Sequence, residues 1–358
     1  MKNTLKNPFM SRQKNTKNVF CFILIVSLLA FGCEKHNSSD GISDFSSIAF
    51  IARITDNSAD WSLCTMDKSG NNMQKIVDKV VGCLKPIRSH CGTRLLFTSH
   101  SELYIVNIDG TGLTLIDYGS FSGMDWLPNN KHIVYVKYMD SYYDSTALVL
   151  YNTLDNTKTI LQTEGNVCNP KFSPDGRQIA YCTSIANSHR IYKMDINGQN
   201  NRLIISEGAS PIWSPQGNKI AYLSTGVDRS SQISVANADG SNQKQLTSTV
   251  SSGWWDTGFP RDGNEDPQWT PNGEKIVYVS YENGKPEIFI MNADGSQQTR
   301  LTKAEYRDEC PEVTPDGKYI LYSSRRSDMM NNGIVMMTLD GKNEKILSKT
   351  GIHPIACK

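Results

Sequence analysis

The chain has 358 residues, of which 38% are hydrophobic and 20% are charged, with 26 Gly and 14 Pro. This composition is typical of a globular protein and excludes both a disordered chain and a multi-span membrane protein. Its 37 Lys and Arg against 36 Asp and Glu give a net charge of +1, which lacks the basic excess of nucleic-acid binders. We therefore expect no nucleic-acid partner. Length alone suggests two or three domains, at about 100–200 residues each.

The first 32 residues have the features of a secretory signal peptide. They contain five Lys or Arg and no Asp or Glu, and they lead into an apolar stretch from Val19 to Phe31. This stretch is shorter than the roughly 20 residues that cross a hydrocarbon core, but it suits a signal-peptide h-region. A short retained membrane anchor is the alternative. Without these five charges, 32 basic residues face 36 acidic ones, a net of −4.

Gly32-Cys33 ends the apolar stretch and resembles the lipobox of bacterial lipoproteins, although Ala30 stands where the pattern prefers a branched aliphatic residue. The resemblance implies that Cys33 is acylated and becomes the mature N-terminus, because several acyl chains hold a protein at a bilayer. Glu34 in place of Asp implies no retention at the inner membrane. We expect a polar tether over 33–46 and a lipid anchor in the cell envelope, at the outer membrane, with either face possible.

A unit then recurs along the chain. Its first half is NPKFSPDGRQIAYCTS at 169–184, SPIWSPQGNKIAYLST at 210–225, DPQWTPNGEKIVYVSY at 266–281 and CPEVTPDGKYILYSSR at 310–325, with weaker copies at 85–100 and 123–138. Its second half includes QISVANADGSNQKQLT at 232–247 and EIFIMNADGSQQTRLT at 287–302. Alternating apolar residues predict strands, and the Pro-Asp-Gly and Ala-Asp-Gly turns predict hairpins. Each unit is therefore predicted to be four antiparallel strands.

Four-stranded units that repeat every 40-odd residues indicate an all-β protein with the blades of a β-propeller. The residue aligned with the first proline of the motif occurs seven times, at Pro86, Met124, Pro170, Pro211, Pro267, Pro311 and Pro354. The sequence therefore predicts seven innermost strands, and a propeller over 47–358.

The two ends of this region are complementary. Residues 48–77 supply three outer strands with no inner strand before them, and residues 353–358 supply an inner strand with no outer strands after it. We predict that the two segments form one blade, which closes the ring without an open sheet edge. Deleting residues 352–358 should then destabilise the whole ring. A six-bladed ring, with 85–119 as a loop excursion, is the alternative.

The repeat resembles that of TolB-type propellers, whose blades read P-x-W-S-P-D-G, then I-A-Y, M-N-A-D-G and R-L-T. Pro211–Gly217, Met291–Gly295 and Arg300–Thr302 match this pattern, and the resemblance covers about residues 85–358. It differs from TolB itself, which has an α/β domain before a six-bladed propeller. The resemblance therefore implies the fold, while function has to be argued from the site.

Strand alternation places the loops before each inner strand and the loops between second and third strands on one face of the ring. This face is predicted to carry aromatic and arginine residues that bind a partner. These residues are Tyr142, Tyr143, Trp254, Trp255, Phe259, Arg261, Tyr281, Tyr306, Arg307 and Arg325.

The segment 248–265 is the most distinctive part of this face. The aligned motif positions lie 38 to 46 residues apart elsewhere, but Pro211 and Pro267 are 56 apart, so about ten residues are inserted. Long loops in compact repeats are commonly functional, and Trp and Arg are enriched at interface hot spots. Alternatively, Trp254 or Trp255 plugs the channel or packs between blades.

Catalytic patterns are weak in this sequence. His100, His189 and His353 fall on the predicted binding face but in different blades, with no paired histidine spacing, so we expect neither a metal site nor a cofactor. There is also no Gly-x-Ser-x-Gly nucleophile elbow. Seven-bladed oligogalacturonate lyases share this style of repeat, but their clustered histidines have no counterpart here.

Seven cysteines remain once Cys21 and Cys33 are set aside, so at least one is not in a disulfide. Cys168 and Cys182 each lie seven residues from Asp175 in a predicted hairpin turn, so they could face one another across neighbouring strands at disulfide distance. Two buried thiols are the alternative.

Together these features predict a lipid-anchored envelope propeller that binds or scaffolds an envelope protein or a glycan. The alternative is a carbohydrate-active enzyme of the envelope, a lyase or hydrolase, with its site on the propeller face. Convergence of the three histidines would favour the enzyme.

Overall fold

The computed structural model divides the chain into two compact units, Met1–Asn37 and Ser38–Lys358. The structure describes residues 45–53, 61–81, 84–140, 145–185, 188–226, 230–249, 263–303, 305–326 and 332–357. These residues, all in the second unit, form 28 strands and no helix. Accordingly, the described part of the chain has no helix that could cross a membrane.

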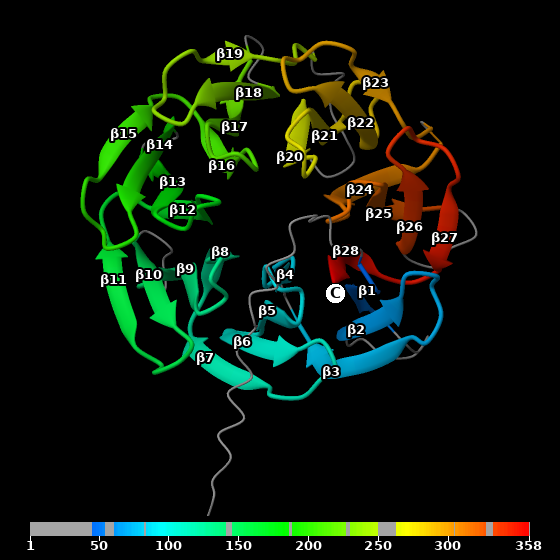
Figure 1. The fold of residues 1–358 in the computed structure, drawn as a ribbon, viewed down its shortest axis with the longest axis horizontal. Helices are drawn as coiled ribbons and strands as arrows, with labels where there is room; N and C mark the ends of the chain where they lie inside the picture. Colours follow the sequence, from blue (N-terminus) through cyan, green and yellow to red (C-terminus); the bar gives the residue numbers. More distant parts are fainter. Residues whose placement is uncertain are drawn as a thin grey trace, which may run out of the picture. The chain divides into compact units, whose positions relative to one another are not determined.

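The strands form seven four-stranded antiparallel sheets, which are the blades of a ring (Figure 1). From the axis outward, blade 1 contains β28 (Ile352–Cys357), β1 (Ser47–Ala52), β2 (Trp61–Asp67) and β3 (Gln74–Val80); blade 2 contains β4 (Ile87–Arg88), β5 (Arg94–Ser99), β6 (Glu102–Asn107) and β7 (Thr114–Tyr118); blade 3 contains β8 (Phe121–Trp126), β9 (His132–Tyr138), β10 (Thr146–Asn152) and β11 (Lys158–Gln162). Blade 4 contains β12 (Val167–Phe172), β13 (Gln178–Ile185), β14 (Ser188–Asp195) and β15 (Arg202–Ile205); blade 5 contains β16 (Ala209–Trp213), β17 (Lys219–Thr225), β18 (Ser231–Asn237) and β19 (Lys244–Gln245). Blade 6 contains β20 (Asn264–Trp269), β21 (Lys275–Ser280), β22 (Glu287–Asn292) and β23 (Thr299–Arg300); blade 7 contains β24 (Arg307–Val313), β25 (Tyr319–Arg325), β26 (Gly333–Thr338) and β27 (Lys345–Ser348).

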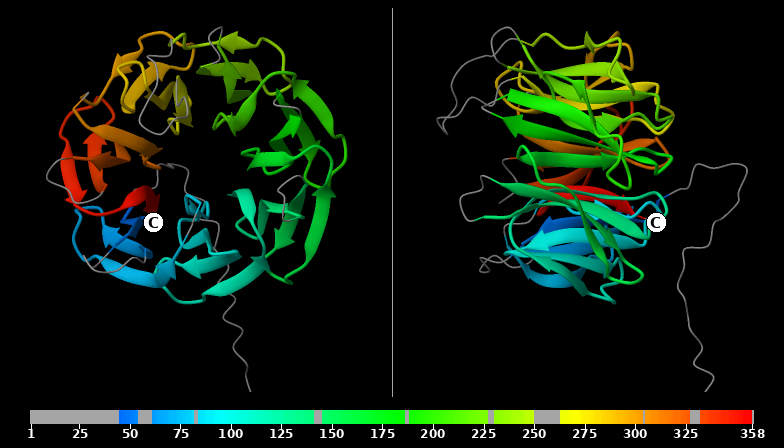
Figure 2. Two further views of the ribbon diagram at one scale, coloured as in Figure 1. Left: turned by 180° about the vertical axis from the view of Figure 1, so that it is seen from behind. Right: turned by 90° about the vertical axis from the view of Figure 1, so that its left-hand side faces the viewer.

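The predicted seven-bladed all-β fold is thus confirmed. The six-bladed alternative is wrong, because residues 87–118 form the complete sheet β4–β7 instead of a loop excursion. In the side view of Figure 2, the strands of each blade run between the two faces of the ring.

The ring closes as the sequence predicts, because β28 pairs with β1. Ser47 lies opposite Cys357 and Ile48 opposite Ala356, and the Ser46 amide donates to the Cys357 carbonyl over 2.9 Å. The propeller also begins earlier than the predicted residue 47. Phe45 is 2% exposed and packs in the core against Leu347 and other apolar side chains. The predicted tether therefore loses its last two residues to the propeller.

The turn motifs hold the hairpins together. Between β12 and β13, the Asp175 carboxylate accepts hydrogen bonds from the Ser173 hydroxyl at 2.6 Å and the Arg177 amide at 3.1 Å, while Gly176 has a φ of +71°. The outer turns repeat this chemistry: Asp294 accepts from both the amide and the hydroxyl of Ser296. These hydrogen bonds lower the pKa of both aspartates. Asp-Gly is therefore selected by turn geometry.

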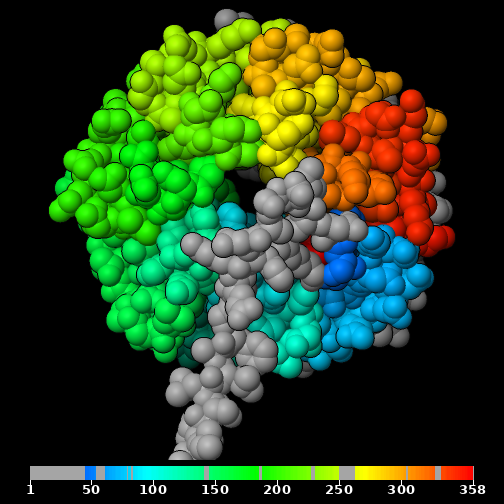
Figure 3. Space-filling model, viewed as in Figure 1, coloured from blue at the N-terminus to red at the C-terminus, as the bar shows by residue number. Residues whose placement is uncertain are grey.

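The motif tryptophans join neighbouring blades. The indole N–H groups of Trp126, Trp213 and Trp269 donate to the carbonyls of Ile87, Lys171 and Ile212 in the preceding blade, over 3.1 to 3.3 Å. Each ring is at most 9% exposed, so it contributes apolar burial as well as a satisfied polar atom. The blades consequently pack side by side around the axis (Figure 3).

Candidate functional site

The predicted binding face is best described at blade 7. β24 begins and β25 ends at the same edge, because Arg307 pairs with Arg325 in the antiparallel register. We call Tyr306, Arg307, Arg325 and Arg326 the arginine–tyrosine patch. Of the residues predicted for this face, Tyr142, Tyr143, Trp254, Trp255, Phe259 and Arg261 lie outside the described residues, as does the lipidation candidate Cys33.

Tyr281 is the predicted binding residue that the structure places elsewhere. It is only 4% exposed and packs with Val279, Ile288 and Tyr322 in the core between blades 6 and 7. It therefore offers no surface to a partner, and this prediction is corrected. The aligned residue of the next blade, Arg325, is exposed, so the repeat pattern alone does not distinguish the two positions.

Within the patch, Tyr306 and Arg326 form a fixed pair. The Arg326 guanidinium lies 4.8 Å from the centroid of the Tyr306 ring, and it bonds the Glu344 carboxylate at 2.8 Å and the Ser324 hydroxyl at 3.1 Å. Its side chain is 10% exposed. Burial acts to lower the pKa of Arg326, but the hydrogen bond and charge of Glu344 raise it overall. Arg326 is consequently a charged, preorganised part of the surface.

Arg307 and Arg325 are the more accessible cations. Arg307 is 42% exposed and contacts Glu309 at 3.2 Å, while Arg325 is exposed and has no ion pair among the described residues. Two guanidinium groups directly opposite one another on adjacent strands repel each other unless an anion lies between or above them. Among the described residues, Arg325 is therefore the unpaired positive charge of the patch, beside the Arg307–Glu309 and Arg326–Glu344 ion pairs.

Asp308 lies directly behind the patch, where sequence reasoning did not place a functional group. It is 1% exposed, and burial raises its pKa to about 6, against the opposing effects of hydrogen bonds from Ser324 and Thr302 and the charge of Arg326. The signal that could have found it is its position, three residues before the motif proline Pro311, where Gly208 and Gly351 stand in two other blades.

A pocket of about 510 Å³ opens on the same face between blades 4 and 5. It is lined by hydroxyl-bearing and small residues together with one imidazole and one carboxylate: Ser188, His189, Glu207, Gly208, Ala209, Leu223, Ser224, Thr225, Ser230 and Ser231. Such a lining offers many hydrogen-bond donors and acceptors and little charge. It is suited to a polar uncharged group.

The structure does not bring together His100, His189 and His353, which belong to blades 2, 4 and 1. Within the described ranges, no group of three or more His, Cys, Asp or Glu side chains could hold a metal ion. Burial lowers the pKa of His353 to about 4, so this imidazole is neutral at physiological pH.

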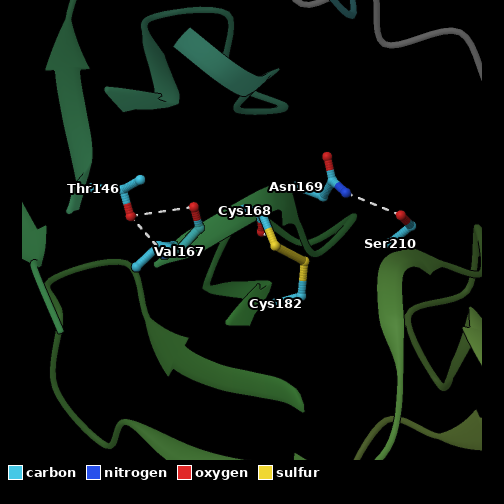
Figure 4. The surroundings of a disulfide bond; sticks show 6 residues. All are labelled: Thr146, Val167, Cys168, Asn169, Cys182 and Ser210. Carbon is cyan, nitrogen blue, oxygen red and sulfur yellow. Dashed lines mark hydrogen bonds between the residues drawn. A yellow bond between two sulfur atoms is a disulfide. The ribbon is translucent and has the colours of Figure 1, made fainter. Parts of the chain in front are cut away.

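Cys168 and Cys182 are opposite one another in the register of β12 and β13, with Cα atoms 5.0 Å apart, and the structure joins their sulphur atoms (Figure 4). Nearby, the Asn169 amide donates to the Ser210 hydroxyl of blade 5 over 2.9 Å. The pair thus lies where two inner strands meet. Peptide mapping without reductant tests the bond, and alkylation of both thiols would disprove it.

Comparison with known proteins identifies the repeat. The model of the TolB beta propeller domain matches residues 42–253 and 209–354. The chain is 29% identical to the Tol-Pal system protein TolB of Francisella tularensis over 183 residues, which cover 49% of this chain and 39% of that protein. It spans about half, or less, of the length of the curated relatives it matches.

Solved structures show the same fold. TolB from Acinetobacter baumannii superimposes with a TM-score of 0.52 at 18% identity, covering 86% of this chain and 81% of that one. The β-propeller domain of the Trilobed protease from Pyrococcus furiosus has a TM-score of 0.64 at 11% identity, covering 86% and 93%. Because the family model covers most of the described propeller, the chain belongs to the TolB β-propeller domain family.

Proposed function

We propose that this protein is a lipid-anchored binding module of the bacterial cell envelope, which scaffolds an envelope protein through the arginine–tyrosine patch. The observation that carries the proposal is the patch itself, with two accessible guanidinium groups beside a preorganised Tyr306–Arg326 pair. Arg and Tyr in such settings are typical of interface hot spots. The matching partner surface is acidic, with carboxylates that Arg307 and Arg325 bind bidentately.

Two further features support this proposal. The matched Francisella TolB is by name a component of the Tol-Pal system, and a module that acts with other proteins is consistent with that relationship. The basic, apolar leader ending at Cys33 favours export and acylation. An extracytoplasmic location is also compatible with a Cys168–Cys182 disulfide.

Affinity capture from the native envelope tests the patch. We expect the double variant Arg307→Ala/Arg325→Ala to lose the main protein partner, because both charge-assisted contacts are removed. Arg177→Ala is the matched control: Arg177 is exposed in the turn between β12 and β13, on the opposite face. Equal recovery of the same partner by all three proteins would reject the patch as the binding site.

The inserted loop is tested separately with Trp254→Ala/Trp255→Ala. If its aromatic residues contribute to binding, this variant loses the partner or a glycan while its melting temperature is unchanged. An identical partner set would reject the role of the loop in binding, and a lowered melting temperature with intact binding would favour the packing alternative. Capture of a polysaccharide instead of a protein would assign the face to a glycan.

The anchor is tested by Cys33→Ala with Cys21→Ser as control. Metabolic labelling with a fatty acid should mark the wild type and Cys21→Ser but not Cys33→Ala, which should appear in the soluble fraction. Label that persists in Cys33→Ala would contradict lipidation at this residue.

A further inference from the structure

Arg88 breaks the repeat at a position that is buried in the other six blades, and Arg88 itself is half-buried. In the other six blades the aligned residue of the innermost strand is apolar, namely Trp126, Phe172, Trp213, Trp269, Val313 and Ala356. In blade 2 the same position holds Arg88, at the end of β4, which is only two residues long. The three tryptophans insert against the preceding blade. Arg88 therefore places a guanidinium where the fold otherwise places an apolar side chain.

The surroundings of Arg88 do not neutralise it. Its Nε atom is buried and has no hydrogen-bond partner, and none of the carboxylates in the described residues lies within ion-pair distance of it. Arg88 lies near Cys357 in the closing strand β28, because its charge acts on that thiol. Burial raises the pKa of Cys357 to about 12, and the charge of Arg88 opposes that rise. A buried N–H donor without a partner is costly, so a guanidinium group whose Nε is buried in this way normally pairs with an acceptor or an anion.

A pocket of about 240 Å³ adjoins Arg88 at the axis of the ring. It is lined from six of the seven innermost strands and their approaches, by Lys85, Pro86, Ile87, Arg88, His90, Asp125, Lys171, Gln268, Glu312 and Ile355. Since a water molecule takes about 30 Å³ in the liquid, the pocket has room for several waters or one small anion.

The charges that line this pocket are unbalanced. The Lys85 ammonium contacts the Glu312 carboxylate at 3.2 Å, and the Lys171 ammonium contacts the Asp125 carboxylate at 3.6 Å. Asp125 also accepts the Phe172 amide at 2.9 Å. Both carboxylates are therefore already neutralised, and Arg88 is the cation left over, with His90 also in the lining.

We propose that this axial pocket binds a small oxyanion, a carboxylate or phosphate group, with the Arg88 guanidinium as its main ligand. The planar guanidinium fits two oxygens of either group. The site is separate from the arginine–tyrosine patch and does not depend on the proposed function.

The test measures the melting temperature and calorimetric binding of the purified full-length protein with inorganic phosphate or with succinate, at constant ionic strength and with chloride as reference. A ligand that binds only the folded state raises the melting temperature. We expect a rise with at least one of the two anions, and a Kd at least tenfold weaker in Arg88→Gln. A response to phosphate alone or to succinate alone assigns the source of the oxyanion.

Two further variants separate anion binding at Arg88 from a general effect of the anions on stability. Arg88→Trp restores the apolar pattern of the other blades, so it should melt higher than wild type without anion and show no response to either anion. Arg177→Gln, at an exposed position, should respond as wild type does. The proposal is overturned if neither anion raises the melting temperature of the wild type, or if Arg88→Gln and Arg88→Trp keep the full response.

Discussion

The interface between blades 5 and 6 and the interface between blades 6 and 7 share one hydrogen bond to the backbone but differ in the polar side chains beside it. In both, a threonine hydroxyl accepts the amide of an aligned isoleucine: Thr247 from Ile233 at 2.9 Å, and Thr302 from Ile288 at 3.0 Å. The residue before the isoleucine is Gln232 in one interface and Glu287 in the other. All of these polar side chains are at most 5% exposed.

The first interface is neutral and fully bonded. The Gln232 oxygen accepts from Asn264 at 3.0 Å and Thr247 at 2.9 Å, while its nitrogen donates to Ser230 and the Thr249 carbonyl, both at 2.6 Å. The second interface has carboxylates at the aligned positions, Glu287 and Asp308, and each keeps one buried oxygen without a hydrogen-bond partner. The difference indicates that the first interface favours stability, whereas the second keeps one titratable carboxylate, Asp308, behind the proposed binding surface.

Exchanging the amide and the carboxylate between the two interfaces should have the largest effect on the free energy of unfolding. Gln232→Glu removes both donors of the side chain and buries a charge, so we expect a loss of about 4 kcal/mol. The reverse exchange, Glu287→Gln, relieves the burial of a carboxylate but also gives up its ion pair with Arg300 at 3.7 Å, so we expect a change of less than about 1 kcal/mol. Urea unfolding at pH 7 measures both. Equal destabilisation by the two variants would contradict the difference between the interfaces.

Asp308→Asn should remove a pH dependence from the second interface. Because the folded pKa of about 6 lies above the ordinary value of 3.8, the folded state holds this proton more tightly than the unfolded state. The contribution of Asp308 is therefore most favourable below pH 4 and is lost as pH rises to 6, by on the order of 3 kcal/mol. Asp308→Asn should gain stability relative to wild type between pH 4 and 7.5. A constant difference across this range would show that Asp308 does not titrate there.

Arg326→Gln should extend the pH dependence of stability that Asp308 causes. The charge of Arg326 opposes the rise in the pKa of Asp308, so its removal should raise that pKa further and extend the pH-dependent loss of stability, which begins near pH 4, to a pH above 6. Loss of the Glu344 contact should cost about 1–2 kcal/mol in addition. Unfolding of the variant from pH 4 to 8 measures the shift. An unchanged pH profile would show that the guanidinium does not influence Asp308.

Arg307→Ala should change stability least. Its contact with Glu309 is 42% exposed on the arginine side, and exposed ion pairs contribute about 0–1 kcal/mol. We expect less than about 0.5 kcal/mol by urea unfolding, together with the loss of partner binding proposed above. A larger loss would mean that the patch serves the fold instead of recognition.

Much of the fold was predictable because its signals are local. The spacing of the motif prolines predicts seven inner strands, and the two incomplete segments at the ends of the repeat region predict the β28–β1 pairing that the structure contains. Arg88 was not singled out from the sequence, because a departure from the Trp motif in a weak copy of the repeat carries no chemistry by itself; only its unpartnered Nε and the adjoining pocket point to a ligand. Of the candidate site, Tyr306, Arg307 and Arg325 could be assigned to one edge of blade 7.

The sequence by itself determined the blade unit, its sevenfold repetition and the closure of the ring, because strand alternation and Asp-Gly turns depend on neighbouring residues. Only the tertiary structure decided which side chains of the face are accessible. Tyr281 and Arg325 occupy aligned positions, yet one is buried between blades and the other is exposed. Likewise, Glu287 and Asp308 become buried only where blades 6 and 7 pack together. Burial between blades depends on residues from two repeats at once, so no single repeat encodes it.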